Sequence, residues 1–255
     1  MNADVSRRVF VGSVAAGIPA LAGVAYGVRA GSVLTRGHDH GAAGNPDPMF
    51  DHALKELAAI HNRVQLRGAK GEDARSIAAQ LRSIAAYGLL VGIDAPSKRA
   101  LSDLVRSKGR DAVLYSEVDR AAVKARLKEY GVQLDDRMPN RVALDYNARN
   151  DILTELENGG VTGLLTRTAT RFETIAAETD RLGDRAARVR RVQSSSDRDW
   201  YIGFCQQLQQ EITRLGIDAG LVCGISYFWP LLAPVCAMIE LAAAVQGLFY
   251  LGSCY

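Results

Sequence analysis

The sequence predicts an all-α protein: a helical bundle with a long antiparallel helical hairpin and an apolar C-terminal helical tail. Two observations predict this class. Apolar residues between positions 48 and 216 recur at alternating intervals of three and four, the spacing of one helix face, whereas the alternating pattern of strands is nearly absent. Glycine, proline and small polar residues stand at the ends of these runs, where helices start and stop.

The first two predicted helices have well-marked apolar faces. Asp47 followed by Pro48 is a cap residue with a proline at the first helical position, and Gly68 ends the run. The inward face of the first helix is expected to hold Phe50, Leu54, Leu57, His61 and Val64. The inward face of the second is expected to hold Ile77, Leu81, Ile84, Gly88 and Val91.

Two shorter helices follow. One covers residues 97–108 and is ended by Gly109. The next is expected to start at a capping box of Ser116 and Asp119 and to close at Gly131. After a loop around residue 139, a further helix starts near residue 146 and is expected to break at Gly159-Gly160.

The longest helices form the predicted hairpin. The first has a heptad-like seam of Leu165, Thr168, Phe172, Ile175, Thr179, Leu182 and Val189. The second follows a turn of three serines and is expected to end at Gly216. Its apolar side carries Tyr201, Cys205, Leu208, Ile212 and Leu215. Two long neighbours joined by a short polar turn predict an antiparallel helical hairpin.

Residues 1–30 have a different character. Ser6, Arg7, Arg8 and Phe10 precede a mildly apolar run, and small residues between positions 25 and 30 provide cleavage points. The segment resembles a twin-arginine (Tat) signal peptide, although Gly12 stands where a lysine is common. The resemblance implies that the folded chain crosses the bacterial inner membrane with the twin-arginine translocase as its partner. We therefore expect it in the periplasm or cell envelope, membrane-associated or secreted.

The rest of the chain divides into a Gly-rich flexible linker (31–47), a helical domain (48–216) and an apolar, cysteine-containing tail (217–255). Residues 1–30 hold three arginines and one aspartate, so the remainder has a formal net charge near +1. This balance gives no electrostatic basis for binding nucleic acid.

The histidines are the only candidate metal ligands with a recognisable grouping. His38 and His40 lie in the linker and are the candidates for a loosely held copper, nickel or zinc ion. His52 and His61 are nine residues apart, on opposite faces of one predicted helix, and cannot share an ion. No nucleophile elbow, phosphate-binding loop, dinucleotide-binding turn or zinc-protease motif occurs, so no catalytic residue and no cofactor are assigned.

The tail has three interpretations: it spans a membrane, packs in the core or is released. Residues 219–239 are uncharged and long enough to cross a bilayer. Pro230 and Pro234 interrupt that stretch, which argues against one straight helix. The alternative span, residues 231–251, has to bury Glu240.

The cysteines predict a fold for the tail. Cys205, Cys223, Cys236 and Cys254 are separated by 18, 13 and 18 residues, and 18 residues make about five helical turns. The two prolines lie in the central gap, so an antiparallel hairpin would bring the cysteines together in nested pairs. We predict the disulfides Cys205–Cys254 and Cys223–Cys236, one of three formally possible connectivities; buried free thiols are the alternative.

These observations favour an exported cell-envelope protein with a structural or binding role, whose Tyr227, Phe228 and Trp229 lie near a membrane interface. Two alternatives remain. The leader, the polar helical middle and the apolar cysteine-containing end resemble the organisation of halocin-type bacteriocin precursors, which implies release of an antimicrobial peptide from the C-terminal region. The histidine segment is the basis of the other, an exported metal-binding protein.

Overall fold

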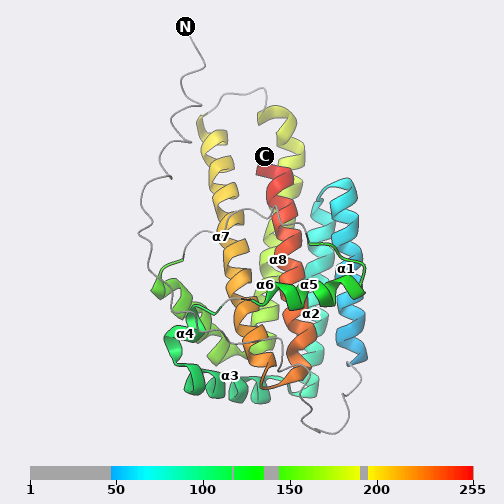
Figure 1. Cartoon of the computed structure of the whole chain (residues 1–255). Coiled ribbons are helices and arrows are strands. Elements are labelled where there is room, and N and C mark those ends of the chain that lie inside the picture. The colour runs from blue at the N-terminus through cyan, green and yellow to red at the C-terminus, as the bar shows by residue number, and fades with distance from the viewer. Residues whose placement is uncertain (1–46, 117, 135–143, 190–194, 255) are drawn as a thin grey trace. The chain divides into compact units, whose positions relative to one another are not determined.

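The computed structural model describes residues 47–116, 118–134, 144–189 and 195–254, with side chains described outside residues 183–197. Within these ranges every regular element is helical and no strand occurs, so the predicted all-α class is confirmed (Figure 1). The elements are α1 (Pro48–Arg67), α2 (Gly71–Val91), α3 (Asp94–Lys108), α4 (Arg110–Leu114), α5 (Arg120–Glu129), α6 (Tyr146–Val189), α7 (Ser195–Ser226), the short 3₁₀ helix η1 (Pro230–Leu232) and α8 (Ala233–Cys254).

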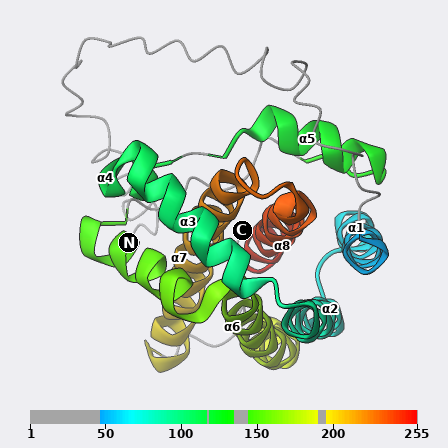
Figure 2. The same ribbon diagram turned by 90° about the horizontal axis from the view of Figure 1, so that it is seen from below.

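The long helices lie side by side, with α8 among them. Helix α2 packs along α6, and α8 packs against α7 and α1, while α5 lies across α8 (Figure 1). Helix α3 crosses one end of the bundle and contacts α6 and α7 (Figure 2). At this same end α1 begins, α2 ends and α7 turns through η1 into α8.

The N-terminal helices follow the sequence pattern closely. The Asp47 carboxylate caps α1 by accepting a hydrogen bond from the Met49 N–H at 2.9 Å. All five residues of its predicted inward face are buried. On α2 the same holds except at Val91, which is 48% exposed. Val91 is the last residue of α2, directly before the left-handed C-cap Gly92.

The turn before α5 corrects the predicted capping box. The Asp119 carboxylate itself caps the helix by accepting hydrogen bonds from the N–H groups of Ala121 and Ala122, each at 3.1 Å. The Ser116 hydroxyl instead donates to the Val113 carbonyl at the end of α4. The prediction placed the helix start one turn too early, because serine and aspartate are both favoured caps.

Helix α6 breaks where the glycine pair predicted. Gly160 has φ 67° and ψ −173°, and the helix resumes behind it. The Asp94 carboxylate, from α3, accepts hydrogen bonds from the Thr162 N–H at 3.0 Å and from the Thr162 hydroxyl. A carboxylate from another helix therefore caps the second half of α6 and satisfies the Thr162 N–H, one of the groups that the break leaves free.

Helices α6 and α7 form the predicted antiparallel hairpin, but α7 is longer than expected. The helix does not end at Gly216 and continues to Ser226. Gly216 and Gly220 are buried inside it, and a Cβ on Gly220 would lie 2.9 Å from the Ser116 carbonyl oxygen. Gly220 allows close packing of the chain segment between α4 and α5, and neither glycine stops the helix.

The apolar tail lies in the core. Helix α8 buries fifteen of its residues, including the polar Glu240 and Gln246. Among the described helices, Pro230–Cys254 has the length and mean hydropathy (1.8) of a membrane span, but 83% of its most apolar window is buried inside the bundle. Pro230 begins η1 and Pro234 lies in the first turn of α8, where a missing N–H costs little.

Candidate functional site

Two disulfides fasten the α7–α8 hairpin near both of its ends. Cys205 near the start of α7 is bonded to Cys254 at the end of α8, with Cα atoms 5.8 Å apart. Cys223 and Cys236 are bonded on the two sides of the turn, with Cα atoms 5.0 Å apart. This is the nested pairing that the cysteine spacing predicted. The Tyr201 hydroxyl adds a hydrogen bond to the Ser253 carbonyl at 2.8 Å beside the outer bridge.

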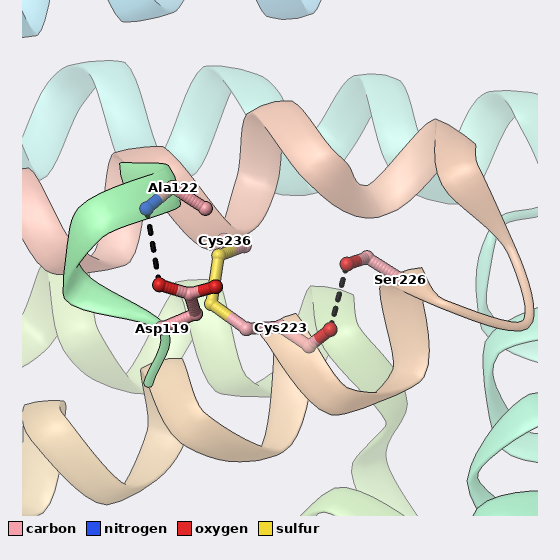
Figure 3. Close-up of a disulfide and its surroundings, with 5 residues drawn as sticks. All are labelled: Asp119, Ala122, Cys223, Ser226 and Cys236. Carbon is pink, nitrogen blue, oxygen red and sulfur yellow. Dashed lines mark hydrogen bonds between the residues drawn. A yellow bond between two sulfur atoms is a disulfide. The ribbon is translucent and has the colours of Figure 1, made fainter. Parts of the chain in front are cut away.

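The inner disulfide lies under the start of α5. The carboxylate of Asp119, which caps that helix, lies beside the bond between Cys223 and Cys236 (Figure 3). The Ser226 hydroxyl donates to the Cys223 carbonyl at 2.6 Å near the end of α7. The α5 cap and the inner bridge therefore meet where the chain reverses into α8.

A cluster of charged side chains lies between α6 and α7. Arg171 Nε is 3.1 Å from Glu211 Oε2, and Arg171 Nη1 is 3.9 Å from Asp218 Oδ2. Three cations and three anions make up the cluster, which we call the α6–α7 charge cluster. Its members are Glu155, Arg167, Arg171, Glu211, Arg214 and Asp218.

The cluster spans the break in α6. Glu155, which precedes Gly160, pairs with Arg167 at 3.2 Å and with Arg214 of α7 at 3.6 Å. The carboxylate thus joins both halves of α6 to α7. These three side chains are each about one-third exposed, so their pairing is partly screened by water.

Asp218 is the most buried member, with 5% of its surface exposed. Burial raises the pKa of its carboxyl to about 6 from the ordinary 3.8, while Arg171, Arg167 and Arg214 oppose the increase. Asp218 therefore gains or loses its proton in a mildly acidic range. A group with such a pKa can hold a proton at the interface of two helices.

A small cavity of about 50 Å³ adjoins the cluster. Its lining combines charged, polar and apolar side chains: Arg171, Thr174, Ile175, Glu178, Phe204, Gln207, Leu208 and Glu211. The volume suits a few water molecules and lies far below the several hundred Å³ of a typical small-molecule site. The arrangement can hold water and protons between α6 and α7, and it contains no nucleophile paired with a base.

The histidines that the structure describes do not come together. His61 is buried on α1 with Nδ1 3.3 Å from Asn62 Oδ1, and burial lowers the pKa of its ring. His52 is exposed on the same helix. The described residues include no group of three metal-ligating side chains. His38 and His40, like the signal residues Ser6, Arg7, Arg8 and Phe10, lie outside the described residues.

The sequence carried a weak signal for the charge cluster that the predictions did not use. Glu211, Arg214 and Asp218 recur at intervals of three and four, so they share one side of α7. The aromatic residues between α7 and η1 were singled out, and in the structure Tyr227 and Phe228 are exposed and Trp229 is half-buried.

Comparisons with protein-family models, with curated proteins and with solved structures find no match for this chain.

Proposed function

We propose that the chain is an exported helical protein of the bacterial cell envelope with a structural or binding role. The observation that carries the proposal is the pair of nested disulfides on the α7–α8 hairpin. Disulfides persist in oxidising compartments outside the cytoplasm and are rare within it. The segment around Arg7 and Arg8 that resembles a twin-arginine signal supplies the matching route of export.

The packing of α8 supports this role over release of an antimicrobial peptide. Helix α8 is buried against α7 and α1, so its departure would expose most of the apolar core. Both disulfides also join α8 to α7, so a cut between these helices leaves the C-terminal fragment attached. The burial of α8 and its two disulfides to α7 therefore favour a protein that acts as an intact fold.

Fractionation of a bacterium that expresses the full chain tests the proposal. Cells carrying the unchanged chain are compared with the Arg7→Lys/Arg8→Lys variant, and Arg29→Lys is the matched control outside the motif. We expect the unchanged and control chains in the periplasmic or envelope fraction and the double variant in the cytoplasm. Non-reducing peptide mapping of the exported protein is expected to recover both cysteine pairs. Free thiols in a chain found only in the cytoplasm would overturn the proposal.

A further inference from the structure

Apolar side chains gather without cover at one end of the bundle. Leu89, Leu90 and Val91 form the last turn of α2 and are 64%, 83% and 48% exposed. We use the name apolar end for these three residues together with Met49, Tyr227, Phe228 and Leu231, each at least 38% exposed.

Helix topology brings these residues to one end. Met49 lies in the first turn of α1, and the other residues lie where α2 ends and where α7 turns into α8. Figures 1 and 2 place these helix termini at the end that α3 crosses. The Tyr87 hydroxyl donates to Asp47 at 2.7 Å, which fastens the last turns of α2 to the start of α1.

Folding does not require apolar residues here. Polar side chains would occupy the same exposed positions without a loss of core packing, whereas clustered exposed apolar residues in soluble proteins generally mark a contact surface. The composition is also specific, because leucines stand beside Tyr227, Phe228 and the half-buried Trp229. Tyrosine and tryptophan beside aliphatic residues are typical of the boundary between lipid and water.

The charge at this end suits an anionic surface. Helix α3 carries four basic and two acidic residues. Its Arg99 and Arg106 are seven residues apart, so they share the side of the helix that lies opposite the buried Ser97, Ala100, Leu101 and Leu104. Of the two acids of α3, Asp94 accepts hydrogen bonds from Thr162 of α6, and Asp103 pairs with Arg106. With four basic and two acidic side chains, α3 has a formal net charge of +2.

We propose that the apolar end docks on the surface of a bilayer containing anionic phospholipid. Leu89, Leu90 and Phe228 would enter the lipid, the cations of α3 would contact headgroups, and α8 would stay in the core. The proposal deepens the proposed function and rests on it, since a location in the envelope gives access to such a surface.

Vesicle flotation tests the docking. Residues 44–255 form a compact unit by themselves, so a chain without residues 1–30 is used, which removes the apolar signal-like stretch as a second source of binding. We expect flotation with phosphatidylglycerol–phosphatidylcholine vesicles and little with phosphatidylcholine alone. The Leu90→Ser/Phe228→Ser variant should partition at least tenfold less, since burying one such side chain is worth roughly tenfold or more. Leu66→Ser is the matched control, an exposed leucine (89%) at the other end of α1.

Tryptophan fluorescence provides an independent measurement. The chain holds two tryptophans, Trp200 near the start of α7 and Trp229 at the apolar end. In Trp200→Phe, the emission of Trp229 should shift to shorter wavelength when anionic vesicles are added. In Trp229→Phe, the emission of Trp200, which stacks on Phe204, should not shift.

Four results would overturn the proposal. In flotation, the Leu90→Ser/Phe228→Ser variant would bind vesicles as well as the unchanged chain, or the Leu66→Ser control would lose as much binding as that variant. In fluorescence, the emission of Trp200 would shift on addition of vesicles and that of Trp229 would not. The fourth result is a protein that stays in solution only when detergent is present. Self-association through Leu90 and Phe228 without vesicle binding would assign the apolar end to contacts between copies and also refute docking. Export and disulfide formation are read separately, so docking can fail while the proposed function holds.

Discussion

Removing the outer disulfide should destabilise the protein more than removing the inner one. The change is Cys205→Ala/Cys254→Ala, compared with Cys223→Ala/Cys236→Ala, because alanine avoids placing a new hydroxyl in the core. The outer pair is 49 residues apart and the inner pair 13. With the inner bridge intact, the outer bridge closes a ring of two arms of 18 residues each.

Loop-closure entropy gives the magnitudes. The chain-entropy relation is applied to the ring of two 18-residue arms for the outer bridge and to the 13-residue loop for the inner bridge. Loss of the outer bridge then lowers the free energy of unfolding by about 3.8 kcal/mol, and loss of the inner bridge lowers it by about 2.9 kcal/mol. The difference follows from ring size alone, since longer closed loops restrict the unfolded chain more. Both variants should also show a larger denaturant slope, because their unfolded chains expose more surface.

Urea unfolding followed by circular dichroism is the measurement. Reduced unchanged protein is the control, and its free energy of unfolding should match that of a third variant in which all four cysteines are changed to alanine. A loss below about 1 kcal/mol for the outer pair, or an inner-pair loss that exceeds the outer one, would refute the entropic account. Equal denaturant slopes in all variants would contradict it as well.

Three further changes test other parts of the fold. Gly160→Ala should lower the free energy of unfolding by about 1–3 kcal/mol, because φ is positive there and a Cβ meets Asp94, whereas the control Gly159→Ala should cost far less in the same urea titration. Asp94→Ala should cost about 1–2 kcal/mol by removing the cap on Thr162, and a cost near zero would show that water replaces the carboxylate. Asp218 binds its proton more tightly in the folded state, with a pKa of about 6 against 3.8, so its ionisation should reduce stability by about 3 kcal/mol as pH rises from about 4 to above 6. Asp218→Asn should remove that decline in unfolding curves measured at several pH values, and a variant that keeps it would assign the decline to other groups.

Local signals were sufficient for much of the fold. Asp47-Pro48 and Gly68 mark the ends of α1 in the sequence because caps act within a few residues. The cysteine spacing worked for the same reason, since 18 residues of helix keep both partners on one side of each arm. The Gly216 prediction failed because a glycine that ends a helix and one that lies buried inside a helix look alike in sequence. The two kinds of glycine can be told apart only from what packs against them in the folded chain. At Gly220 this is the backbone of Ser116.

The charge cluster could be predicted only in part. Helical spacing places Glu211, Arg214 and Asp218 on one side of α7, but it does not say which helix faces them. Glu155 joins Arg214 from 59 residues away, across the break at Gly160. The raised pKa of Asp218 depends on burial between two helices, which is a property of the packed bundle and not of any short segment.

Hydropathy misjudges α8 for a related reason. Mean hydropathy reports how apolar a helix is and does not report what surrounds it. A value of 1.8 therefore fits a lipid-facing span and a core helix equally well. Two polar residues separate these cases, since Glu240 and Gln246 are buried within the protein on different turns of α8. A lipid-facing helix would expose at least part of its surface to hydrocarbon, whereas here α7, α1 and α5 provide the cover. The same packing holds the cysteines of α7 and α8 within bonding distance, so the bundle can align its thiols before they are oxidised. The proposed twin-arginine route carries folded chains, so on that route the fold would form first and the disulfides would then lock it.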